Sequence, residues 1–386
     1  MRWIFLSVLF VASCFVEAKQ TICLNMIVKN EREVITRCLN SVKSVIDYWV
    51  IVDTGSSDGT QDIIRECMKD VPGELYERPW KNFAHNRNEA LDFARDKADY
   101  VLIMDADDFL EFQPEFSVDT LDREAYQLHI TRDSVSFYRT QLIKMSCPWR
   151  WVGVLHEYLT CDRPHTSKVL EHVNYQTTHE GARSQDPQKY LKDSQVLEEA
   201  LKEEPANTRY VFYLAQSYKD AGKKHKALEW YQKRVAMGGW DEEVYQCLLY
   251  MAHLRKELEY PLEEVIDSYT RAFRYRPHRA EAPYFLSVLF RDQGRFDLAY
   301  HLITGYKALP KPVQEDILFV QDWIGSYGLD FEMSISSFYV GAFQESLDLC
   351  DALLANETVP KAWKDRVEKN RVFALSRVEE TFQKCA

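Results

Sequence analysis

Apolar segments of strand length alternate with segments of helical character in the first part of the chain. Three of them are almost continuously apolar: TICLNMIV at 21–28, YWVIV at 48–52 and YVLIM at 100–104. A strand that is apolar on both faces must be covered on both sides, and the segments at 33–45, 61–69 and 82–97 have the period of helices. The sequence therefore predicts an α/β domain, a parallel sheet with helices on both faces.

The pattern changes twice further along the chain. Between residues 121 and 178 polar and apolar residues alternate more loosely, so we expect antiparallel or mixed strands that complete the sheet in an order the pattern does not give. From about Pro187 onward the apolar period is 3.6 residues and strand signals become rare. We predict an α/β domain at 19–185 and an all-helical domain at 186–386.

The helical part contains an internal repeat. Gly222 and Ala227 recur 72 positions later as Gly294 and Ala299, and Gly341 follows Gly294 by 47 positions. A shift of 72 equals two units of about 36 residues, close to the period of tetratricopeptide repeats. Glycine at these places is expected to end the first helix of each pair. The repeat that should lie near 245–275 fits only loosely.

Residues 1–18 form a segment of a different kind. After a basic start the chain is almost entirely apolar from Trp3 to Val16, which fits a signal peptide and is short for a membrane span. Cleavage before Lys19, lipidation of Cys14 and retention as an uncleaved anchor are the alternatives. The segment predicts a secretory or membrane-associated protein, with a cytoplasmic body if it is an uncleaved anchor.

Charge and cysteine content exclude some classes of function. The net charge of -12 argues against nucleic acid as a partner, because binding its phosphates needs a basic surface. An anionic ligand would need a cation or a local basic cluster beside it. The nine cysteines are scattered without C-x-x-C spacing, so we expect buried free thiols, not a zinc ribbon or a disulfide framework.

An acidic triplet, Asp105-Ala106-Asp107, comes directly after the buried strand at 100–104. In extended backbone residues i and i+2 point to the same side, so both carboxylates are expected to face the edge where open α/β sheets bind ligands. Two aligned carboxylates suit Mn²⁺ or Mg²⁺, which could in turn hold a diphosphate.

The segment DTGSSDGT at 53–60 follows the strand at 48–52. Its Gly, Ser and Asp residues are typical of an ordinary turn, with Thr60 capping the next helix. The functional alternative places Asp53 at the tip of the strand, where it hydrogen-bonds a base or a ribose. The segment by itself does not decide between the two.

Four motifs occur in a fixed order: VKNE at 28–31, VDTGSSDGT at 52–60, FAHNRNEAL at 83–91 and MDADD at 104–108. The series resembles the family 2 glycosyltransferases with the GT-A fold, and more narrowly the branch fused to tetratricopeptide repeats. WVGVLHEY at 151–158 and RYVFYLAQSY at 209–218 are also similar to that branch. The resemblance spans residues 20–245. It implies a GT-A-type, Rossmann-like mixed sheet followed by an all-helical, tetratricopeptide-like domain.

The resemblance implies roles for the residues that match its motifs. The nucleotide sugar would be bound by Asn30, Glu31, Asp53, Asp58, Arg87 and Asp105. Asp107 would bind the metal ion directly and Asp105 through water, with His179 or His156 as a further ligand. Glu157 would be the base that takes the acceptor's proton in an inverting transfer. Asp108 adds a third carboxylate, which leaves open which two matter.

The predicted activity is metal-dependent transfer of a sugar from a nucleotide-sugar donor to a glycan, lipid or protein acceptor. One rival is a catalytically silent scaffold for protein–protein interaction. The presence of Asp53, Asp105, Asp107 and Glu157 argues against it. Another is a nucleotidyltransferase, but VKNERE lacks the Gly-rich basic signature expected after its first strand. The repeat domain is expected to present the acceptor or to bind a protein partner.

Overall fold

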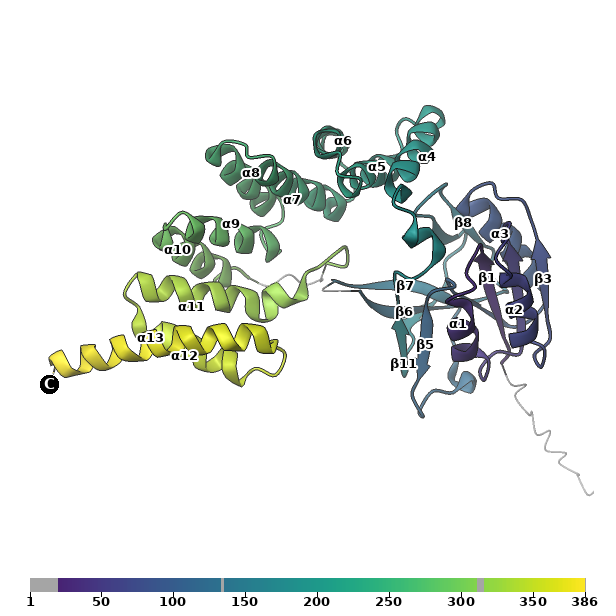
Figure 1. Cartoon of the computed structure of the whole chain (residues 1–386), viewed down its shortest axis with the longest axis horizontal. Coiled ribbons are helices and arrows are strands. Elements are labelled where there is room, and N and C mark those ends of the chain that lie inside the picture. Colours follow the sequence, from purple (N-terminus) through teal and green to yellow (C-terminus); the bar gives the residue numbers. More distant parts are fainter. Residues whose placement is uncertain (1–19, 133–134, 311–315, 386) are drawn as a thin grey trace, which may run out of the picture.

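The computed structural model describes residues 20–132, 135–310 and 316–385. The predicted signal peptide or anchor at 1–18 lies outside the described residues. The chain forms an α/β domain and a curved array of helices that begins beside it (Figure 1). Within the described part, no helix is both long enough and apolar enough to cross a membrane.

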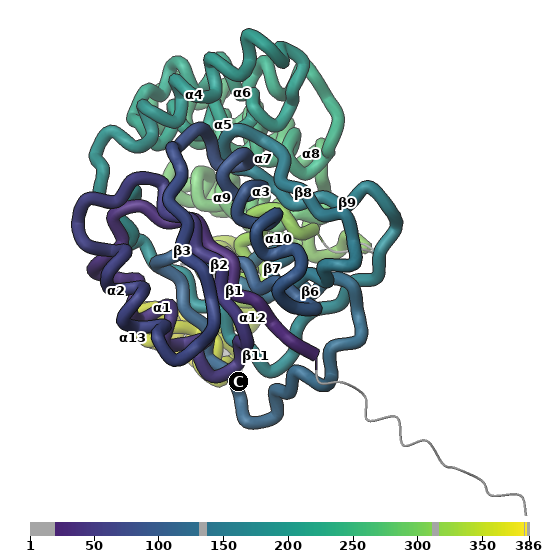
Figure 2. The backbone as a smooth tube through the Cα atoms, turned by 90° about the vertical axis from the view of Figure 1, so that its right-hand side faces the viewer, coloured from purple at the N-terminus to yellow at the C-terminus, as the bar shows by residue number. Residues whose placement is uncertain are grey.

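One half of the central sheet is parallel. Its strands in spatial order are β3 (Gly73–Glu77), β2 (Tyr48–Asp53), β1 (Ile22–Val28) and β4 (Tyr100–Ile103). The connecting helices are α1 (Ile35–Val42), α2 (Thr60–Cys67) and α3 (Phe83–Ala94). Helices α1 and α2 pack on one face of the sheet and α3 on the other (Figure 2). The predicted parallel sheet with helices on both faces is confirmed.

The other half of the sheet is mixed, as predicted. It continues from β4 through β7 (Val135–Lys144), β6 (Ala125–Arg132), β11 (Val173–Gln176) and β5 (Phe109–Phe112), with β10 (Ser167–Val169) beside β6. β7 runs antiparallel to both β4 and β6. A separate two-stranded sheet is made by β8 (Trp149–Val152) and β9 (Tyr158–Cys161), and β8 packs near α3.

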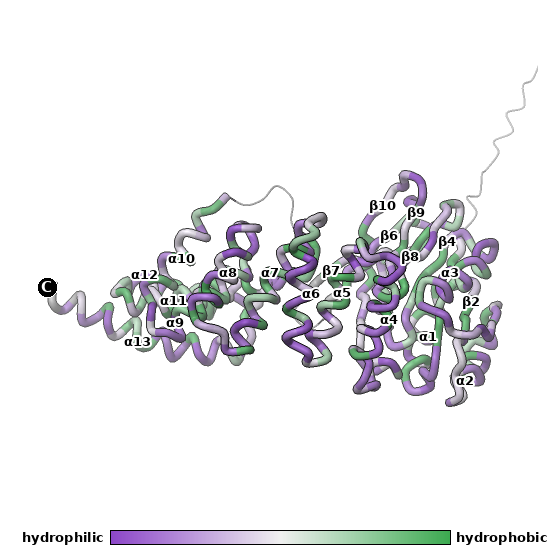
Figure 3. Tube along the Cα trace, turned by 90° about the horizontal axis from the view of Figure 1, so that it is seen from above, coloured by the Kyte–Doolittle hydropathy of each residue, from purple (hydrophilic) through white to green (hydrophobic). Residues whose placement is uncertain are grey.

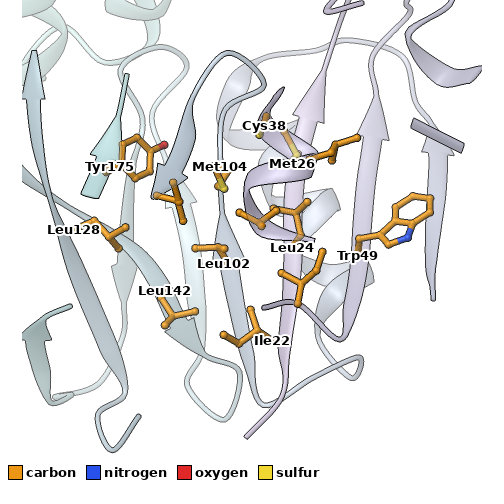
Figure 4. Packing of buried hydrophobic residues seen from close by; sticks show 14 of the residues in the cluster. Ile22, Leu24, Met26, Cys38, Trp49, Leu102, Met104, Leu128, Leu142 and Tyr175 are labelled. Carbon is orange, nitrogen blue, oxygen red and sulfur yellow. The ribbon is translucent and has the colours of Figure 1, made fainter. Parts of the chain in front are cut away.

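Side chains of the central strands alternate between two cores. On β1, Ile22, Leu24 and Met26 face α1 and α2 (Figure 4), whereas Cys23 faces α3. This is the period of two that a strand imposes, and each large apolar side chain buried in this way contributes about 1.5–3 kcal/mol. The described cysteines are free thiols and most are buried, as expected.

The helical domain consists of antiparallel helices that pack on their neighbours in chain order (Figures 1 and 3). They are α4 (Lys189–Glu203), α5 (Thr208–Asp220), α6 (Lys224–Met237), α7 (Asp241–Glu257), α8 (Leu262–Tyr275), α9 (Glu281–Asp292), α10 (Phe296–Lys307), α11 (Leu329–Tyr339), α12 (Phe343–Ala355) and α13 (Lys361–Cys385). An array of this kind buries a continuous core between successive helix pairs. The predicted all-helical repeat architecture is confirmed.

The repeat glycines end helices as predicted. Gly222, Gly294 and Gly341 have φ values of 71°, 71° and 87° after α5, α9 and α11. The pair α7–α8 makes the same turn with Glu259, at φ 56°. The Tyr260 backbone N–H also donates to the Arg255 carbonyl, five residues earlier, at 3.0 Å, as expected of such a helix cap. A glutamate in the glycine position explains why this repeat fits the sequence pattern only loosely.

The segment at 316–321, between α10 and α11, lies along the inner face of the array and is bound through its backbone. The N–H groups of Ile317 and Leu318 donate to one carboxylate oxygen of Glu242 at 2.8 and 2.7 Å. Gln246 donates to the carbonyls of Leu318 and Phe319 at 3.0 and 3.3 Å. These contacts join the α10–α11 connection to α7.

Asp316 fixes the start of that segment. Arg276 Nε and Arg279 donate to its carboxylate at 2.7 and 3.1 Å, and His278 lies 3.3 Å away. Burial opposes ionisation of Asp316, but hydrogen bonds from these three side chains outweigh it and lower its pKa to about 2.

We expect Asp316→Asn to destabilise the protein at pH 7 by about 3 kcal/mol, because it leaves the buried Arg279 with one counter-charge fewer. A carboxylate whose pKa is depressed on folding stabilises the protein above its unfolded pKa, and this contribution is lost as pH falls through the folded value. The difference between wild type and variant should therefore shrink from pH 5 toward pH 2. Urea unfolding followed at several pH values measures it, and Asp62→Asn, at an exposed surface pair, is the control.

Candidate active site

A cleft of about 660 Å³ opens at the carboxyl ends of β1, β2 and β4. Its far wall is the 3₁₀ helix η2 (Ala182–Gln185) together with the first turns of α4. Open α/β sheets bind ligands at this edge, and the volume suits a small-molecule site, which typically has roughly 300–1,000 Å³. Its polar and charged lining includes Lys29, Asn30, Glu31, Arg87, Asp105, Asp107, Arg183, Lys189 and Lys192.

Asn30 and Glu31 follow β1 and tie it to other parts of the site. Asn30 has a left-handed backbone, with φ 58°, and its Oδ1 accepts from the Ser57 N–H at 2.8 Å. Its own N–H donates to Ser56 Oγ at 2.8 Å. The Glu31 carboxylate accepts from the Ala182 N–H at 3.1 Å. Asn30 thus fixes the loop after β2, and Glu31 joins β1 to η2 across the cleft.

The loop after β2 is an ordinary turn, but it leaves one carboxylate oxygen of Asp53 without a hydrogen bond from the part of the chain that the structure describes. Oδ1 of Asp53 accepts from the N–H groups of Gly55 and Ser56 at 2.9 and 2.8 Å, whereas its Oδ2 is buried with no hydrogen-bond partner among the described residues. Asp58 binds the backbone N–H and the hydroxyl of Thr60, at the start of α2, at 3.0 and 2.6 Å. Neither Asp53 nor Asp58 is among the residues that line the cleft, and their contacts with a nucleotide stay predictions.

The acidic triplet does not have the expected backbone. β4 ends at Ile103, and residues 105–108 form a turn in which the Asp108 N–H donates to the Asp105 carbonyl at 3.2 Å. The predicted extended backbone at residues 105–107 is therefore wrong. The turn gives the two carboxylates different partners: guanidinium groups for Asp105, and the Gly181 N–H, at 3.2 Å, for Asp107. Both side chains still line the cleft.

Arg87 is buried between two carboxylates. Its terminal nitrogen donates to Asp105 Oδ1 and its Nε to Glu157 Oε1, each at 2.6 Å, and its guanidinium lies over the Trp151 ring. Arg139 donates to the other oxygen of Asp105 at 3.3 Å. Burial alone would raise the pKa of Asp105, but the two guanidinium groups outweigh it and hold that pKa well below its usual range. Asp105 is therefore ionised, and both of its oxygens are engaged.

Asp108 is the last residue of the turn, and its side chain is buried. Its Oδ2 accepts from the Tyr175 hydroxyl at 2.6 Å, and the same hydroxyl accepts from Arg139 at 3.0 Å. Burial, reinforced by the charge of Asp105, raises the pKa of Asp108 to about 7. Of the three carboxylates, Asp105 and Asp107 line the cleft, whereas Asp108 is buried and shares Arg139 with Asp105.

Glu157 lies in the loop between β8 and β9. Only 10% of its side chain is exposed, and Arg87 connects it to the cleft. Val154 and Leu155 of the same loop line the cleft, but Glu157 is not among the lining residues. Its role as a base stays a prediction, whereas its ion pair with a cleft residue is a feature of the fold.

The two histidines considered as metal ligands lie in different places. His179 belongs to the segment around Asp107, whose carbonyl accepts from the Thr178 hydroxyl at 2.9 Å. His156 stacks on Tyr213 with ring centroids 3.8 Å apart. Across residues 20–132, 135–310 and 316–385, no three His, Cys, Asp or Glu side chains are placed to hold a metal ion. The metal roles of Asp105, Asp107 and His179 stay predictions.

No pattern in the sequence predicts the basic wall of the cleft. Arg183, Lys189 and Lys192 come from η2 and α4 and face the side that carries Glu31 and Asp107. Lys192 and Arg183 also pair with acidic residues of the same wall. Each is an ordinary cation on a helix surface, and only the fold brings it beside the sheet. Three cations therefore line this side of the cleft, and two of them are paired with Asp186 and Asp193.

Residues 23–130 match the model of glycosyl transferase family 2. These residues form a family 2 glycosyltransferase domain. The match begins in β1 and ends in β6, so it includes Asn30, Asp53, Arg87 and Asp107. Glu157, the basic wall and the helical domain lie beyond it.

Relatives extend the similarity beyond the glycosyltransferase domain. A TPR repeat-containing protein of Synechococcus elongatus is 28% identical over 309 residues, which are 73% of this chain and 74% of that protein. The SPbeta prophage-derived glycosyltransferase SunS of Bacillus subtilis is 27% identical over 237 residues, 56% of this chain. The matched region spans about half of SunS, 53% of its length.

Half of this chain is also similar to solved helical-repeat structures. MamA covers 50% of the chain with 15% identity and a TM-score of 0.31. A tetratricopeptide repeat protein from Parabacteroides merdae covers the same share with 17% identity and a TM-score of 0.36. The helix pairs described above, not these distant likenesses, define the helical domain as a repeat array.

Proposed function

We propose that the protein transfers a sugar from a nucleotide-sugar donor to an acceptor with inversion at the anomeric carbon, and that the cleft binds the donor. The observation that carries this proposal is the lining of the cleft. One side presents Glu31, Asp105 and Asp107 at the carboxyl edge of the sheet, and the other presents Arg183, Lys189 and Lys192. A nucleoside diphosphate needs such cations near its phosphates.

The nucleoside end of the donor is assigned to the β1–β2 side of the cleft. Asp53 Oδ2 is a buried acceptor without a hydrogen-bond partner among the described residues, and a buried unsatisfied carboxylate oxygen is costly. An N–H group of the base would satisfy it. Thr54, the next residue, lines the cleft. Asn30 holds the loop that follows both residues.

The transfer needs a group that accepts a proton. An acceptor hydroxyl or other nucleophile forms a bond to the anomeric carbon while the bond from that carbon to the diphosphate oxygen breaks. Glu157 takes the proton that the acceptor loses, and the nucleoside diphosphate leaves with the electron pair. Arg87 holds Glu157 in place and keeps it next to the cleft. General base catalysis of this kind typically contributes about 10²–10⁴-fold to the rate.

The carboxylates that line the cleft are of the kind that would hold Mn²⁺ or Mg²⁺. Burial, reinforced by the charges of Asp107, Asp58 and Asp105, raises the pKa of Glu31 to about 7. A cation bound beside these carboxylates would offset their repulsion. Carboxylate oxygens are the ligands such hard cations prefer. Asp107 would hold the cation, with His179 beside it. When bound, the cation stabilises charge on the leaving diphosphate.

A thermal-shift screen of UDP-, GDP-, CMP- and TDP-sugars, each with and without Mn²⁺, tests the proposal. We expect one class of donor to raise the melting temperature in the presence of Mn²⁺, because binding only the folded state stabilises it. Asp107→Asn should remove the Mn²⁺-dependent part of that shift. The control is Asp62→Asn, on the exposed surface of α2.

The same screen separates the proposal from its rival. A catalytically silent scaffold with no donor site would show no shift with any sugar nucleotide, which would overturn the proposal. If the donor binds but no nucleoside diphosphate is released during a long incubation, the protein is a scaffold and not a catalyst.

A further inference from the structure

The loop that carries Glu157 is held by the helical domain. The Val154 N–H donates to the hydroxyl of Tyr210 on α5 at 3.2 Å. Leu155 is 4% exposed and packs in the core that α4, α5 and α6 share. The carbonyl of His156 accepts two hydrogen bonds from Arg209 of α5, at 3.0 and 2.9 Å. Three consecutive residues before Glu157 are therefore fixed by α5 and its neighbours.

Aromatic contacts reinforce the same attachment. The His156 ring lies flat on Tyr213, with 3.8 Å between centroids and 9° between planes. The Arg209 guanidinium lies over the rings of both Tyr158 and Tyr213, at 5.1 and 4.9 Å from their centroids. Arg209 is thus held by rings on both domains while it binds the loop, which restricts its rotamers before the hydrogen bonds form.

The loop needs this support because its backbone is unusual. His156 has φ 52°, a left-handed conformation that costs a residue with a Cβ about 1–3 kcal/mol. Gly153, at φ 109°, makes the bend that opens the loop. At its other end β8 is fixed to the glycosyltransferase domain, where Asn88 exchanges two hydrogen bonds with the Trp151 backbone at 2.7 and 2.9 Å. The conformation between Gly153 and Glu157 depends on contacts with α5.

We propose that Arg209, Tyr210 and Tyr213 of α5 are positioning residues for Glu157, so that the helical domain completes the active site. This inference rests on the proposed function, because it takes Glu157 as the base. None of the three side chains lines the donor cleft. They act through the loop, which sets where the Glu157 carboxylate meets Arg87.

Two substitutions in the full chain test the proposal. Arg209→Met keeps the length of the side chain but removes both hydrogen bonds to the loop, and Tyr210→Phe removes one hydroxyl. The substrate is the sugar nucleotide that raises the melting temperature in the thermal-shift screen. We expect Arg209→Met to lower kcat for its hydrolysis about 10–100-fold, because a misplaced base affects the chemical step. KM should change less than about threefold. Arg209→Lys should restore part of the loss, and Tyr210→Phe should cost less than Arg209→Met.

Tyr218→Phe is the matched control. Tyr218 lies on the same helix and is buried to the same extent as Tyr210, but its hydroxyl bonds to Glu198 on α4. The Tyr218→Phe substitution should leave kcat unchanged. Hydrogen exchange of the backbone at 153–157 should become faster in Arg209→Met and not in Tyr218→Phe.

The outcomes are distinct. The proposal is overturned if Arg209→Met and Tyr210→Phe keep kcat within twofold, or if Tyr218→Phe lowers it as much as they do. It is also overturned if exchange at 153–157 is unchanged in Arg209→Met. A wild-type protein that turns over no donor, while the exchange result holds, would defeat the proposed function and leave the attachment of the loop to α5 in place.

Discussion

Glu157→Gln is expected to lower kcat for donor turnover by about 10²–10⁴-fold, the usual contribution of a general base. The glutamine oxygen can still accept from Arg87 Nε, which lies 2.6 Å from the glutamate oxygen in the wild type. The loop and the cleft should therefore keep their shape, and only the capacity to take a proton is lost. Release of nucleoside diphosphate measures kcat, and calorimetric titration with the donor measures Kd, which should change less than about threefold because the interaction lost belongs to the chemical step.

Glu89→Gln is the matched control for this variant. Glu89 also forms an ion pair with an arginine, Arg78 Nε at 3.1 Å, but it lies outside the cleft. Its substitution should leave both kcat and Kd unchanged. Retention of kcat in Glu157→Gln would show that another group is the base, and loss of donor affinity in that variant would show that the carboxylate acts in binding.

The sequence predicts the parallel half of the sheet well because those strands are apolar on both faces and their helices have clear periods. Local pattern determines this much of the fold. The mixed half is different: β6 and β7 pair as neighbours in the chain, but β11 lies between β6 and β5. Their pairing depends on long-range packing, and no pattern within a single strand encodes it.

The same distinction holds within the site. Asn30, Asp53, Arg87 and Asp107 belong to recognisable motifs, whereas Arg139 has no motif and reaches Asp105 only because β7 lies beside β4. The predicted geometry of the acidic triplet is wrong because β4 ends one residue earlier than the apolar pattern indicates, and the chain then turns. Periodicity does not define strand ends to one residue, and one residue decides where a carboxylate points.

The basic wall was missed for a related reason. Lys189 and Lys192 lie on α4, beyond the boundary expected between the domains at 185/186, yet they line the same cleft as Asp107. Dividing the chain by its hydrophobic period places them in a different domain from the motifs. The division describes secondary structure, while the cleft and the Glu157 loop both extend across it.

Arg87→Met is expected to destabilise the protein by about 3–5 kcal/mol and to abolish turnover. Arg87 and Glu157 side chains are each 10% exposed, so removal of the cation leaves a buried carboxylate without its counter-charge. Asp105 keeps Arg139 as a partner, which places most of the cost on Glu157. Unfolding of the full chain in urea measures the change. Arg65→Met is the control: Arg65 also pairs with two carboxylates, Asp62 and Glu77, but is 53% exposed and should change stability by less than about 0.5 kcal/mol.

The double variant Arg87→Met/Glu157→Gln separates charge from packing as the cause. If the cost of Arg87→Met comes from the uncompensated charge of Glu157, neutralising Glu157 should recover part of the lost stability, about 1–3 kcal/mol, although activity stays absent. If the cost comes from lost packing of the guanidinium on Trp151, the double variant should be no more stable than the single one. Recovery would show that Arg87 stabilises the fold by compensating the buried charge of Glu157. The ion pair that positions the proposed base would then also stabilise the junction between the β8–β9 loop and the sheet.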